Sequence, residues 1–275
     1  MKKFPLFILM IVLVSSCKTD YEKVRTSNDP KLMYEAANQY YADGNYLNAQ
    51  ALYELSIPYY RGKKEAEDLY YKFADTHYQL GEYILSSHYF KNFASSFYSS
   101  PKKEEAEYMA AYSKYKLSPN YKLDQSYSGE AINALQDYMN AYPDSDKVEE
   151  CTQLIDEIRA KLELKAFEEG RLYYDLRNYN SAIKSFENML KDFPETQRGE
   201  EVRFLILKSS INWATKSVFE KKEERLEASL KKYNTFLRKY PNSSYMEEVD
   251  EIHEIYTAEI KILENVRLKN AGSEY

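Results

Sequence analysis

One pattern recurs five times along the chain and constrains its fold more than any other feature. In each copy a small residue is followed four positions later by a large apolar residue and eleven positions later by an aromatic one. The small residues are Ala49, Ser86, Ala131, Ala182 and Ser229. These offsets keep the side chains on one stripe of an α-helix. In three copies a proline follows the last aromatic residue and ends the helix, because proline cannot continue the hydrogen-bond ladder. The pattern therefore predicts five helices that each bury one face.

Each of these helices has a second helical stretch just upstream. Gly44 and Gly81 stand in two of the intervening turns, where glycine can adopt the left-handed conformation that ends a helix. In three of the upstream stretches the middle of the apolar stripe is a small residue, namely Ala37, Ala74 and Gly170. A small side chain there lets two helices pack closely, so we expect helix hairpins.

The spacings resemble those of the tetratricopeptide repeat (TPR), most clearly in the first, second and fourth copies. The resemblance implies an all-α fold, a superhelical array of about five TPR-like helix hairpins with a C-terminal capping helix. The third and fifth copies depart from the pattern, and we expect longer connections within them at about 117–129 and 215–225. The charged segment at about 244–268 is expected to form the capping helix. No strand alternation of useful length competes with this prediction.

Composition excludes several other classes of protein. With 44% apolar residues the chain can form a core, and with 7 glycines and 8 prolines it is neither collagen-like nor of low complexity. The net charge of −6 makes duplex nucleic acid a poor partner, because phosphate binding needs a basic face. The two cysteines, Cys17 and Cys151, exclude a disulfide framework. Cys151 lies in a helical stretch and is expected to be a small buried residue.

The N-terminus has the features of an export signal. Two lysines precede an apolar run of eleven residues at 4–14, which is too short for a bilayer core of about 30 Å. The run ends in Val-Ser-Ser-Cys at 14–17, which resembles the lipobox of bacterial lipoproteins. The resemblance implies that Cys17 is acylated, for example with palmitate, and it favours the outer membrane because no aspartate follows Cys17. An ordinary secretory signal with an incidental cysteine is the alternative.

These features predict four segments. They are a lipoprotein signal peptide at 1–16, a lipid-anchored tether at 17–29, a TPR-like helical repeat domain at 30–268 and a polar tail at 269–275.

The repeat phase also predicts a binding face. In TPR arrays the first helices of the hairpins line a concave face. Similar residues recur 37 positions apart at its exposed positions, namely Tyr34, Asn38 and Tyr41, then Tyr71, Asp75 and Tyr78. Tyrosine offers contact area at low entropic cost, and asparagine can bond a peptide backbone. A peptide groove is one interpretation, and solvated tyrosines in a chain with 29 of them are the other.

No catalytic constellation accompanies this face. His77, His88 and His253 are the only histidines, and neither metal-ligand spacing nor a nucleophile or phosphate-loop motif occurs. His77 falls where an aromatic residue packs in the repeat, so a core position is expected. We expect no enzyme activity, no metal and no cofactor.

A longer segment narrows the resemblance. The third copy contains Leu-Ser-Pro-Asn-Tyr-Lys-Leu-Asp-Gln at 117–125, and its second helix ends in Tyr-Pro-Asp-Ser at 142–145. Together with the lipobox and the repeat number, this resembles the BamD family. Its members are lipoproteins of the β-barrel assembly machinery in double-membraned bacteria. The likeness covers about 28–265 and is weakest in the fifth copy and the tail.

The resemblance implies a scaffold at the periplasmic face of the outer membrane. Such a protein binds the POTRA domains of BamA and helps to deliver unfolded outer-membrane β-barrel proteins. In the family, an arginine in the turn of the fourth repeat pairs with an acid on a POTRA domain, and the matching residue here is Arg177. Arginine at a position where two other copies have glycine gives up an easy left-handed cap. An ordinary exposed arginine is the alternative.

Two other functions remain open from the sequence. One is a periplasmic TPR adaptor for cell-envelope division or peptidoglycan machinery, which would usually lack the lipobox and the middle insertion. The other is a surface glycan-binding lipoprotein with a TPR-like scaffold, which would usually be much longer.

Overall fold

The chain is all-α, as the repeat pattern predicts. In this computed structural model residues 20–272 are described, and they contain twelve helices and no strand. The helices are α1 (Asp20–Arg25), α2 (Pro30–Ala42), α3 (Tyr46–Tyr60), α4 (Ala66–Gln79), α5 (Tyr83–Ser96), α6 (Lys103–Leu117), α7 (Ser126–Ala141), α8 (Val148–Asp175), α9 (Tyr179–Asp192), α10 (Gly199–Thr215), α11 (Phe219–Lys239) and α12 (Met246–Gly272). Within this part of the chain, no helix is both long enough and apolar enough to cross a bilayer.

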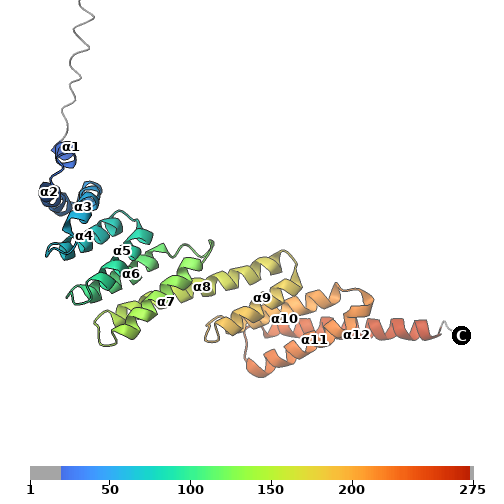
Figure 1. The fold of residues 1–275 in the computed structure, drawn as a ribbon. Coiled ribbons are helices and arrows are strands. Elements are labelled where there is room, and N and C mark those ends of the chain that lie inside the picture. The colour runs from blue at the N-terminus through green and yellow to red at the C-terminus, as the bar shows by residue number, and fades with distance from the viewer. Residues whose placement is uncertain (1–19, 273–275) are drawn as a thin grey trace, which may run out of the picture. The chain divides into compact units, whose positions relative to one another are not determined.

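The described residues form two compact units. Unit 1 contains residues 20–119 and 124–158, and unit 2 contains residues 120–123 and 159–272. Unit 1 has the hairpins α2/α3, α4/α5 and α6/α7 and the first part of α8, up to residue 158 (Figure 1). Unit 2 has the rest of α8, which forms a hairpin with α9, then the hairpin α10/α11 and finally α12. The five predicted hairpins and the C-terminal helix are therefore present.

The small residues of the repeat pattern lie in the cores. All five are buried, with exposed fractions of 0–1%. Gly170 on α8 shows why size matters there, because a Cβ atom built on it would lie 2.4 Å from the ring of Phe186 on α9. No side chain fits at that distance unless the buried ring moves, so the close approach of α8 and α9 requires glycine.

Glycine also ends the first helices of two hairpins. Gly44 and Gly81 have φ angles of 72° and 76°, in the left-handed region. In the second hairpin the Gly81 amide donates to Tyr78 O at 3.0 Å. The amide of the next residue, Glu82, donates to His77 O at 2.9 Å. These two bonds close the helix end, and the second helix then begins within two residues.

Three segments differ from or refine the expectation. The connection in the third hairpin is long, as predicted, and runs over residues 118–125. The expected long connection at about 215–225 is wrong, because only residues 216–218 separate α10 from α11. The charged residues that suggested a loop form two extra turns of α11, held by the Lys222–Glu259 ion pair at 2.9 Å and by buried Leu226. The capping helix α12 extends to Gly272, beyond the predicted start of the polar tail.

The segment predicted as a tether contains a short helix. Residues 20–25 form α1, and its Tyr21 and Val24 pack against the core of the first hairpin. The Tyr21 ring contacts the Tyr40 ring edge-on at a centroid distance of 6.0 Å. Two apolar side chains among polar neighbours are a weak sequence signal, so the helix was not foreseen.

The buried titratable residues serve packing. His77 is 5% exposed, and its ring forms a cluster with those of Phe73 and Tyr89 in which each pair of centroids is 4.8 Å apart. His77 Nδ1 contacts Glu82 at 2.6 Å, which holds the ring in place. Cys151 is fully buried in unit 1, and burial raises the pKa of its thiol to about 11. Both residues occupy core positions, as the sequence predicts.

Candidate functional site

The predicted groove residues lie on the first helices of the first two hairpins. Tyr34, Asn38 and Tyr41 are on α2, and Tyr71, Asp75 and Tyr78 are on α4. We call these six residues the tyrosine face. All six are half-buried, so the tyrosines are not simply solvated.

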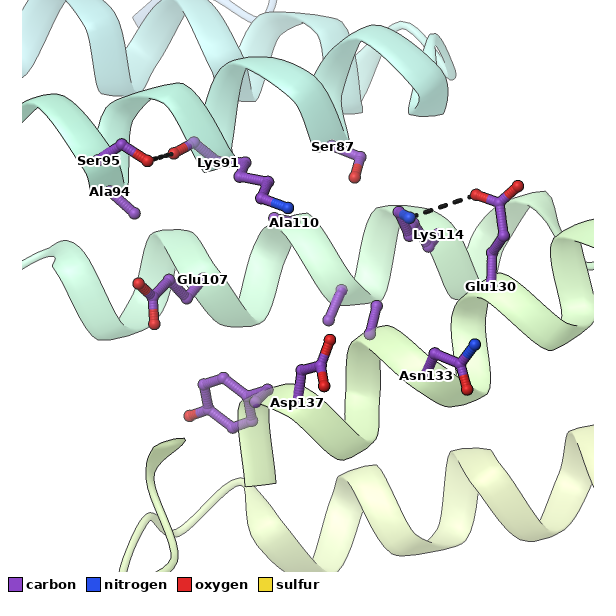
Figure 2. A pocket seen from close by; sticks show the side chains of 13 residues that line it. Ser87, Lys91, Ala94, Ser95, Glu107, Ala110, Lys114, Glu130, Asn133 and Asp137 are labelled. Atoms are coloured by element: carbon purple, nitrogen blue, oxygen red, sulfur yellow. Dashed lines mark hydrogen bonds and ion pairs between the residues drawn. The ribbon is translucent and has the colours of Figure 1, made fainter. Parts of the chain in front are cut away.

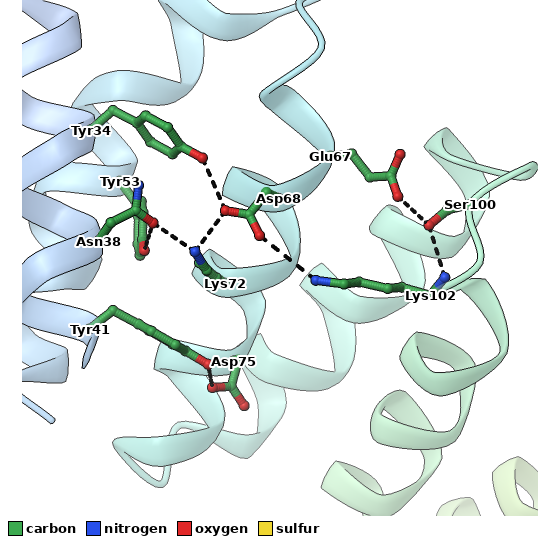
Figure 3. A network of polar contacts seen from close by, with 10 residues as sticks. All are labelled: Tyr34, Asn38, Tyr41, Tyr53, Glu67, Asp68, Lys72, Asp75, Ser100 and Lys102. Atoms are coloured by element: carbon green, nitrogen blue, oxygen red, sulfur yellow. Dashed lines mark hydrogen bonds and ion pairs between the residues drawn. The ribbon is translucent and has the colours of Figure 1, made fainter. Parts of the chain in front are cut away.

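Hydrogen bonds connect the tyrosines of one hairpin to acids of the next. The Tyr34 hydroxyl donates to Asp68 at 3.0 Å, and the Tyr41 hydroxyl donates to Asp75 at 2.6 Å (Figure 3). Each pair is 34 residues apart, so the same contact is made twice along α2 and α4. The bonds fix the ring orientations, because a rotated ring would lose the acceptor of its hydroxyl.

Asn38 occupies the centre of a polar network rather than standing free. Its Oδ1 atom accepts from the Tyr53 hydroxyl at 2.9 Å and from Lys72 Nζ at 2.8 Å. Lys72 also pairs with Asp68 at 2.7 Å (Figure 3). The amide oxygen expected to bond a ligand backbone is therefore used to join α2, α3 and α4. The tyrosine rings remain the part of this face best suited to contact a ligand.

The surrounding groups shift the pKa values of this face. Burial raises the pKa of Tyr34 to about 12, and the nearby Asp68 carboxylate adds to the increase. Burial and the hydrogen bond to Asp75 raise the pKa of Tyr41. Burial alone would raise the pKa of Asp68, but hydrogen bonds from Lys72 and Tyr34 outweigh it and lower that pKa. The tyrosines are therefore neutral donors and the acid is charged near neutral pH.

The same face continues onto α6, which the sequence prediction missed. Tyr108, Tyr112 and Tyr115 follow Tyr71, Asp75 and Tyr78 by 37 residues. Their rings stack along α6 with centroid distances of 5.6–5.7 Å, and the Tyr115 hydroxyl donates to Glu157 on α8 at 2.6 Å. Applying the 37-residue period a second time would have found them.

Arg177 lies in the turn between α8 and α9 with a left-handed backbone. Its φ angle is 59°, and apart from Asn28 it is the only non-glycine residue with positive φ in the described part of the chain. Arg177 N donates to Tyr174 O and Asn178 N donates to Tyr173 O, both at 2.9 Å. This is the bonding pattern of the Gly81 turn, so arginine occupies a glycine conformation.

The Arg177 side chain is exposed in an apolar setting. It makes no ion pair with any residue that the structure describes. Leu172 and Leu176, nearby on the same helix end, are 57% and 67% exposed. Lys216 bonds the Tyr179 hydroxyl at 3.1 Å, which joins this turn to the next one, where Val218 and Phe219 are also exposed. We call Leu172, Leu176, Arg177, Val218 and Phe219 the turn face. It combines one charge with four apolar side chains, a composition typical of interfaces.

Two other predictions concern lipidation and metal binding. Cys17 lies outside the described residues, so the structure does not test its acylation. Among residues 20–272, no group of three or more histidine, cysteine, aspartate or glutamate side chains is arranged to hold a metal ion.

Comparisons with known proteins agree with the sequence resemblance. The family model YfiO, described as an outer membrane lipoprotein, matches residues 26–212 and 173–258. A protein of Aquifex aeolicus (strain VF5), provisionally named outer membrane protein assembly factor BamD, is 22% identical over 263 residues, or 94% of this chain and 85% of the relative.

Two solved TPR structures are similar at 15% identity over 83% of this chain. The TPR2AB-domain:pHSP90 complex of yeast Sti1 is covered to 98%, with a TM-score of 0.38. TTC0263, a thermophilic TPR protein in Thermus thermophilus, is covered to 97%, with a TM-score of 0.30.

Proposed function

Because the chain belongs to the YfiO family of outer membrane lipoproteins, and is thus BamD-like as its sequence predicts, we propose that it is a lipid-anchored scaffold of outer-membrane protein assembly. In this proposal it lies at the periplasmic face of the outer membrane, binds the POTRA domains of BamA, and helps to assemble and insert β-barrel proteins. The name of the Aquifex aeolicus relative, an outer membrane protein assembly factor, supports the same function.

The observation that carries the proposal is the backbone of Arg177. A left-handed non-glycine residue costs about 1–3 kcal/mol, and glycine would remove that cost. Arginine is nevertheless present, and its guanidinium is exposed without an internal partner among the described residues. A strained residue whose side chain does nothing for the fold is best explained by a contact with another protein.

The turn face supplies the rest of the contact with BamA. We propose that Arg177 pairs with a carboxylate on a POTRA domain, as the family resemblance implies. Guanidinium and carboxylate groups can form two parallel hydrogen bonds. The exposed Leu172, Leu176 and Phe219 would cover the pair and exclude water from it. A covered ion pair contributes more to an interface than an exposed one.

The tyrosine face is the proposed site for unfolded β-barrel substrates. The rings of Tyr34 and Tyr41 are held by hydrogen bonds to acids, so a ligand would meet a pre-organised surface there rather than mobile side chains. Aromatic rings contact extended apolar and aromatic segments of any sequence, which suits a protein that serves several substrates.

The anchor is proposed to be Cys17. Acylation after removal of residues 1–16 would place the mature N-terminus in the membrane. Two or three acyl chains on one cysteine bind a bilayer far more firmly than a single chain.

The proposal is tested by titrating the full-length protein with the BamA POTRA region at about 0.1 M salt. Arg177→Glu should weaken binding at least tenfold, or by about 1.4 kcal/mol, while the melting temperature stays nearly unchanged. A compensating acid-to-lysine change on the partner should restore part of the affinity. Co-purification of the wild type with BamA in detergent gives an independent measure.

Arg177→Gly is the matched control for backbone strain. It should weaken binding because the charge is lost. It should also raise stability by up to about 2 kcal/mol, because relief of a strain of about 1–3 kcal/mol outweighs the about 0.4–1 kcal/mol that glycine costs through the freer unfolded chain. Wild-type affinity in Arg177→Glu would mean that the interface lies elsewhere. No POTRA binding by the wild type would reject the proposal in favour of the adaptor for envelope division or peptidoglycan machinery.

A further inference from the structure

The first two hairpins expose aliphatic side chains at the same repeat position. Leu47 on α3 and Ile84 on α5 each stand two residues before the small residue of their helix. They are 64% and 56% exposed, and Leu85 beside Ile84 is 43% exposed. The fourth and fifth hairpins have polar or charged residues at this position, namely Asn180 and Glu227. The exposure is therefore a property of the first two hairpins, and we call Leu47, Ile84 and Leu85 the apolar edge.

A hydrogen bond places the turns of these two hairpins side by side. Gln50, one helix turn after Leu47, donates to the Glu82 carboxylate at 2.7 Å. Glu82 is the N-cap residue of α5 and stands two residues before Ile84. The aliphatic side chains of both hairpins therefore lie at one edge of unit 1, whereas single exposed apolar residues scattered over a surface would carry no meaning.

The apolar edge ends at the third hairpin. Gly129 stands there at the repeat position of Leu47 and Ile84. Near the same end of this hairpin, Lys114 on α6 and Glu130 on α7 pair at 3.3 Å beside the groove between α5, α6 and α7 (Figure 2). An ion pair thus lies close to the third turn, and the exposed aliphatic pattern is confined to the first two hairpins.

The helix α1 brings the proposed lipid anchor to the same edge. The Tyr21 ring of α1 contacts the Tyr40 ring at a centroid distance of 6.0 Å. The Tyr40 carbonyl accepts from the Asn45 amide at 2.8 Å, so Tyr40 belongs to the turn that precedes Leu47. Cys17 is three residues before α1 begins, and acyl chains on it would enter a bilayer close to the apolar edge.

The composition of the two turns favours an apolar contact over an electrostatic one. Residues 43–47 and 80–85 contain two acids and neither lysine nor arginine. Each turn has a tyrosine next to its aliphatic residue, Tyr46 or Tyr83, and tyrosine is enriched where an apolar medium meets water. Anionic lipid surfaces attract clusters of basic residues, so a zwitterionic lipid surface matches this edge better.

We propose that the apolar edge lies in the surface layer of the bilayer that holds the anchor. Its three aliphatic side chains enter the boundary between lipid headgroups and acyl chains, and Tyr46 and Tyr83 lie at the level of the headgroups. The contact orients unit 1 on the membrane, because attachment at one residue alone leaves the unit free to rotate. This inference rests on the proposed acylation of Cys17 and extends it from one anchored residue to a bound surface.

Fluorescence of the acylated protein in vesicles tests the proposal. Cys17 is blocked by its acyl chain and Cys151 is buried, so a new cysteine is the only thiol that reacts with a dye. Leu47→Cys and Ile84→Cys are each labelled with NBD, whose emission shifts to the blue in an apolar medium. The vesicles contain phosphatidylethanolamine and phosphatidylcholine and no other protein. We expect both labels to shift to the blue and to be quenched by brominated lipid.

Tyr98→Cys is the matched control. Tyr98 is 79% exposed and lies beyond the other end of α5, about 20 Å from Ile84 along the helix, so its label should stay in water. Emission at positions 47 and 84 that equals emission at 98 would overturn the proposal. A blue shift in native membranes but not in these vesicles would also overturn it, because another protein would then cover the edge.

The same experiment distinguishes failure of the anchor from failure of the apolar edge. A wild type that takes up dye at Cys17 and does not float with the vesicles rejects the anchor, and the inference falls with it. A wild type that floats and takes up no dye has the anchor, and labels that remain in water then reject the apolar edge alone.

Substitution tests the chemistry with the dye at Leu85→Cys. Leu47→Asn combined with Ile84→Asn copies the residue of the fourth hairpin and should return the emission to its value in water. Leu55→Asn, at a 41% exposed leucine about two helix turns further along α3, should leave the blue shift unchanged. Raising NaCl to about 1 M should also leave it unchanged, because salt screens charges and not apolar contacts. Circular dichroism verifies folding, and an unchanged shift in the folded double variant would refute the membrane contact.

Discussion

The two units join neighbouring helices by different chemistry. In unit 1, tyrosine hydroxyls on one hairpin donate to carboxylates on the next, as in Tyr34–Asp68 and Tyr41–Asp75. In unit 2, lysine and arginine make the corresponding links, as in the Lys208–Glu248 ion pair at 2.6 Å. At Tyr41–Asp75 the neutral donor leaves the acid as the only charge to desolvate, whereas an ion pair such as Lys208–Glu248 requires that two charges give up water. The first arrangement holds the aromatic rings of the tyrosine face in fixed positions.

The middle of the first helix also differs between the units. Ala37 and Ala74 occupy this position in unit 1, and Gly170 occupies it in unit 2. The glycine lets α8 approach the Phe186 ring more closely than a methyl group would allow. Unit 2 is therefore the more sensitive of the two to an added carbon atom.

The largest expected effect tests this difference in packing. Gly170→Ala should destabilise unit 2 by about 1–3 kcal/mol, because the new Cβ would meet a fully buried ring at 2.4 Å. Alanine's better helix propensity, worth up to about 1 kcal/mol, is too small to offset the clash. Urea unfolding followed by the fluorescence of Trp213, the only tryptophan and a residue of unit 2, measures the change.

Gly129→Ala in α7 is the control for that experiment. No atom lies within 4 Å of a Cβ built there, so alanine should stabilise unit 1 slightly. An unchanged or higher urea midpoint in Gly170→Ala would show that Phe186 can move aside and that the close approach is not required.

A smaller effect is the pH dependence of the stability that the hydrogen bonds of Tyr34 and Tyr41 contribute. The pKa of Tyr34 is raised to about 12 and that of Tyr41 is also raised, so the folded protein holds these protons more tightly than the unfolded chain, where tyrosine has a pKa of about 10. Their contribution to stability is complete below pH 10 and is lost as the pH rises from about 10 to 12. Tyr41→Phe should cost about 1 kcal/mol at pH 8 and should reduce the loss between pH 8 and pH 11.

Urea unfolding at both pH values, followed by circular dichroism, tests this expectation. The variant is compared with the wild type and not with unit 2, because Lys208 of unit 2 has a raised pKa and also loses its proton at alkaline pH. Equal losses in Tyr41→Phe and wild type would show that the hydroxyl bond adds nothing to stability.

The smallest expected effect is the response to salt. Raising NaCl from 0.1 M to 1 M shortens the screening length from about 10 Å to about 3 Å. The partly exposed ion pairs of unit 2 should weaken, with a total loss below about 1 kcal/mol in the Trp213 transition. The part of the circular dichroism transition that comes from unit 1 should shift less. Equal shifts in both would remove the distinction between the two kinds of link.

The sequence predicted the parts of this molecule that depend on local periodicity. The five buried small residues, the glycine-capped turns and the phase of the tyrosine face all follow from spacing along single helices. The acid partners of the tyrosines did not, because Asp68 lies 34 residues from Tyr34 and the contact exists only when two hairpins stack. The long connection expected at 215–225 was wrong because a charged helix and a charged loop look alike until their ion pairs are known.

The candidate sites likewise contain features that follow from spacing along the chain and features that depend on contacts between helices. The position of Arg177 in a glycine turn was visible by aligning the repeats, and the structure added its left-handed backbone and its exposed apolar neighbours. The bonds of Asn38 could not be foreseen, because its partners Tyr53 and Lys72 come from two other helices.

The docking of α1 limits how far the repeats can move from a membrane. Only Lys18 and Thr19 separate Cys17 from the first residue of α1, so the path between them spans at most about 10 Å in any conformation. Because α1 packs on α2, the same short segment also limits the distance between Cys17 and the first hairpin. If Cys17 carries the proposed lipid, the start of α1 stays within about 10 Å of the acylated residue, whereas a free 13-residue tether could extend about 40 Å.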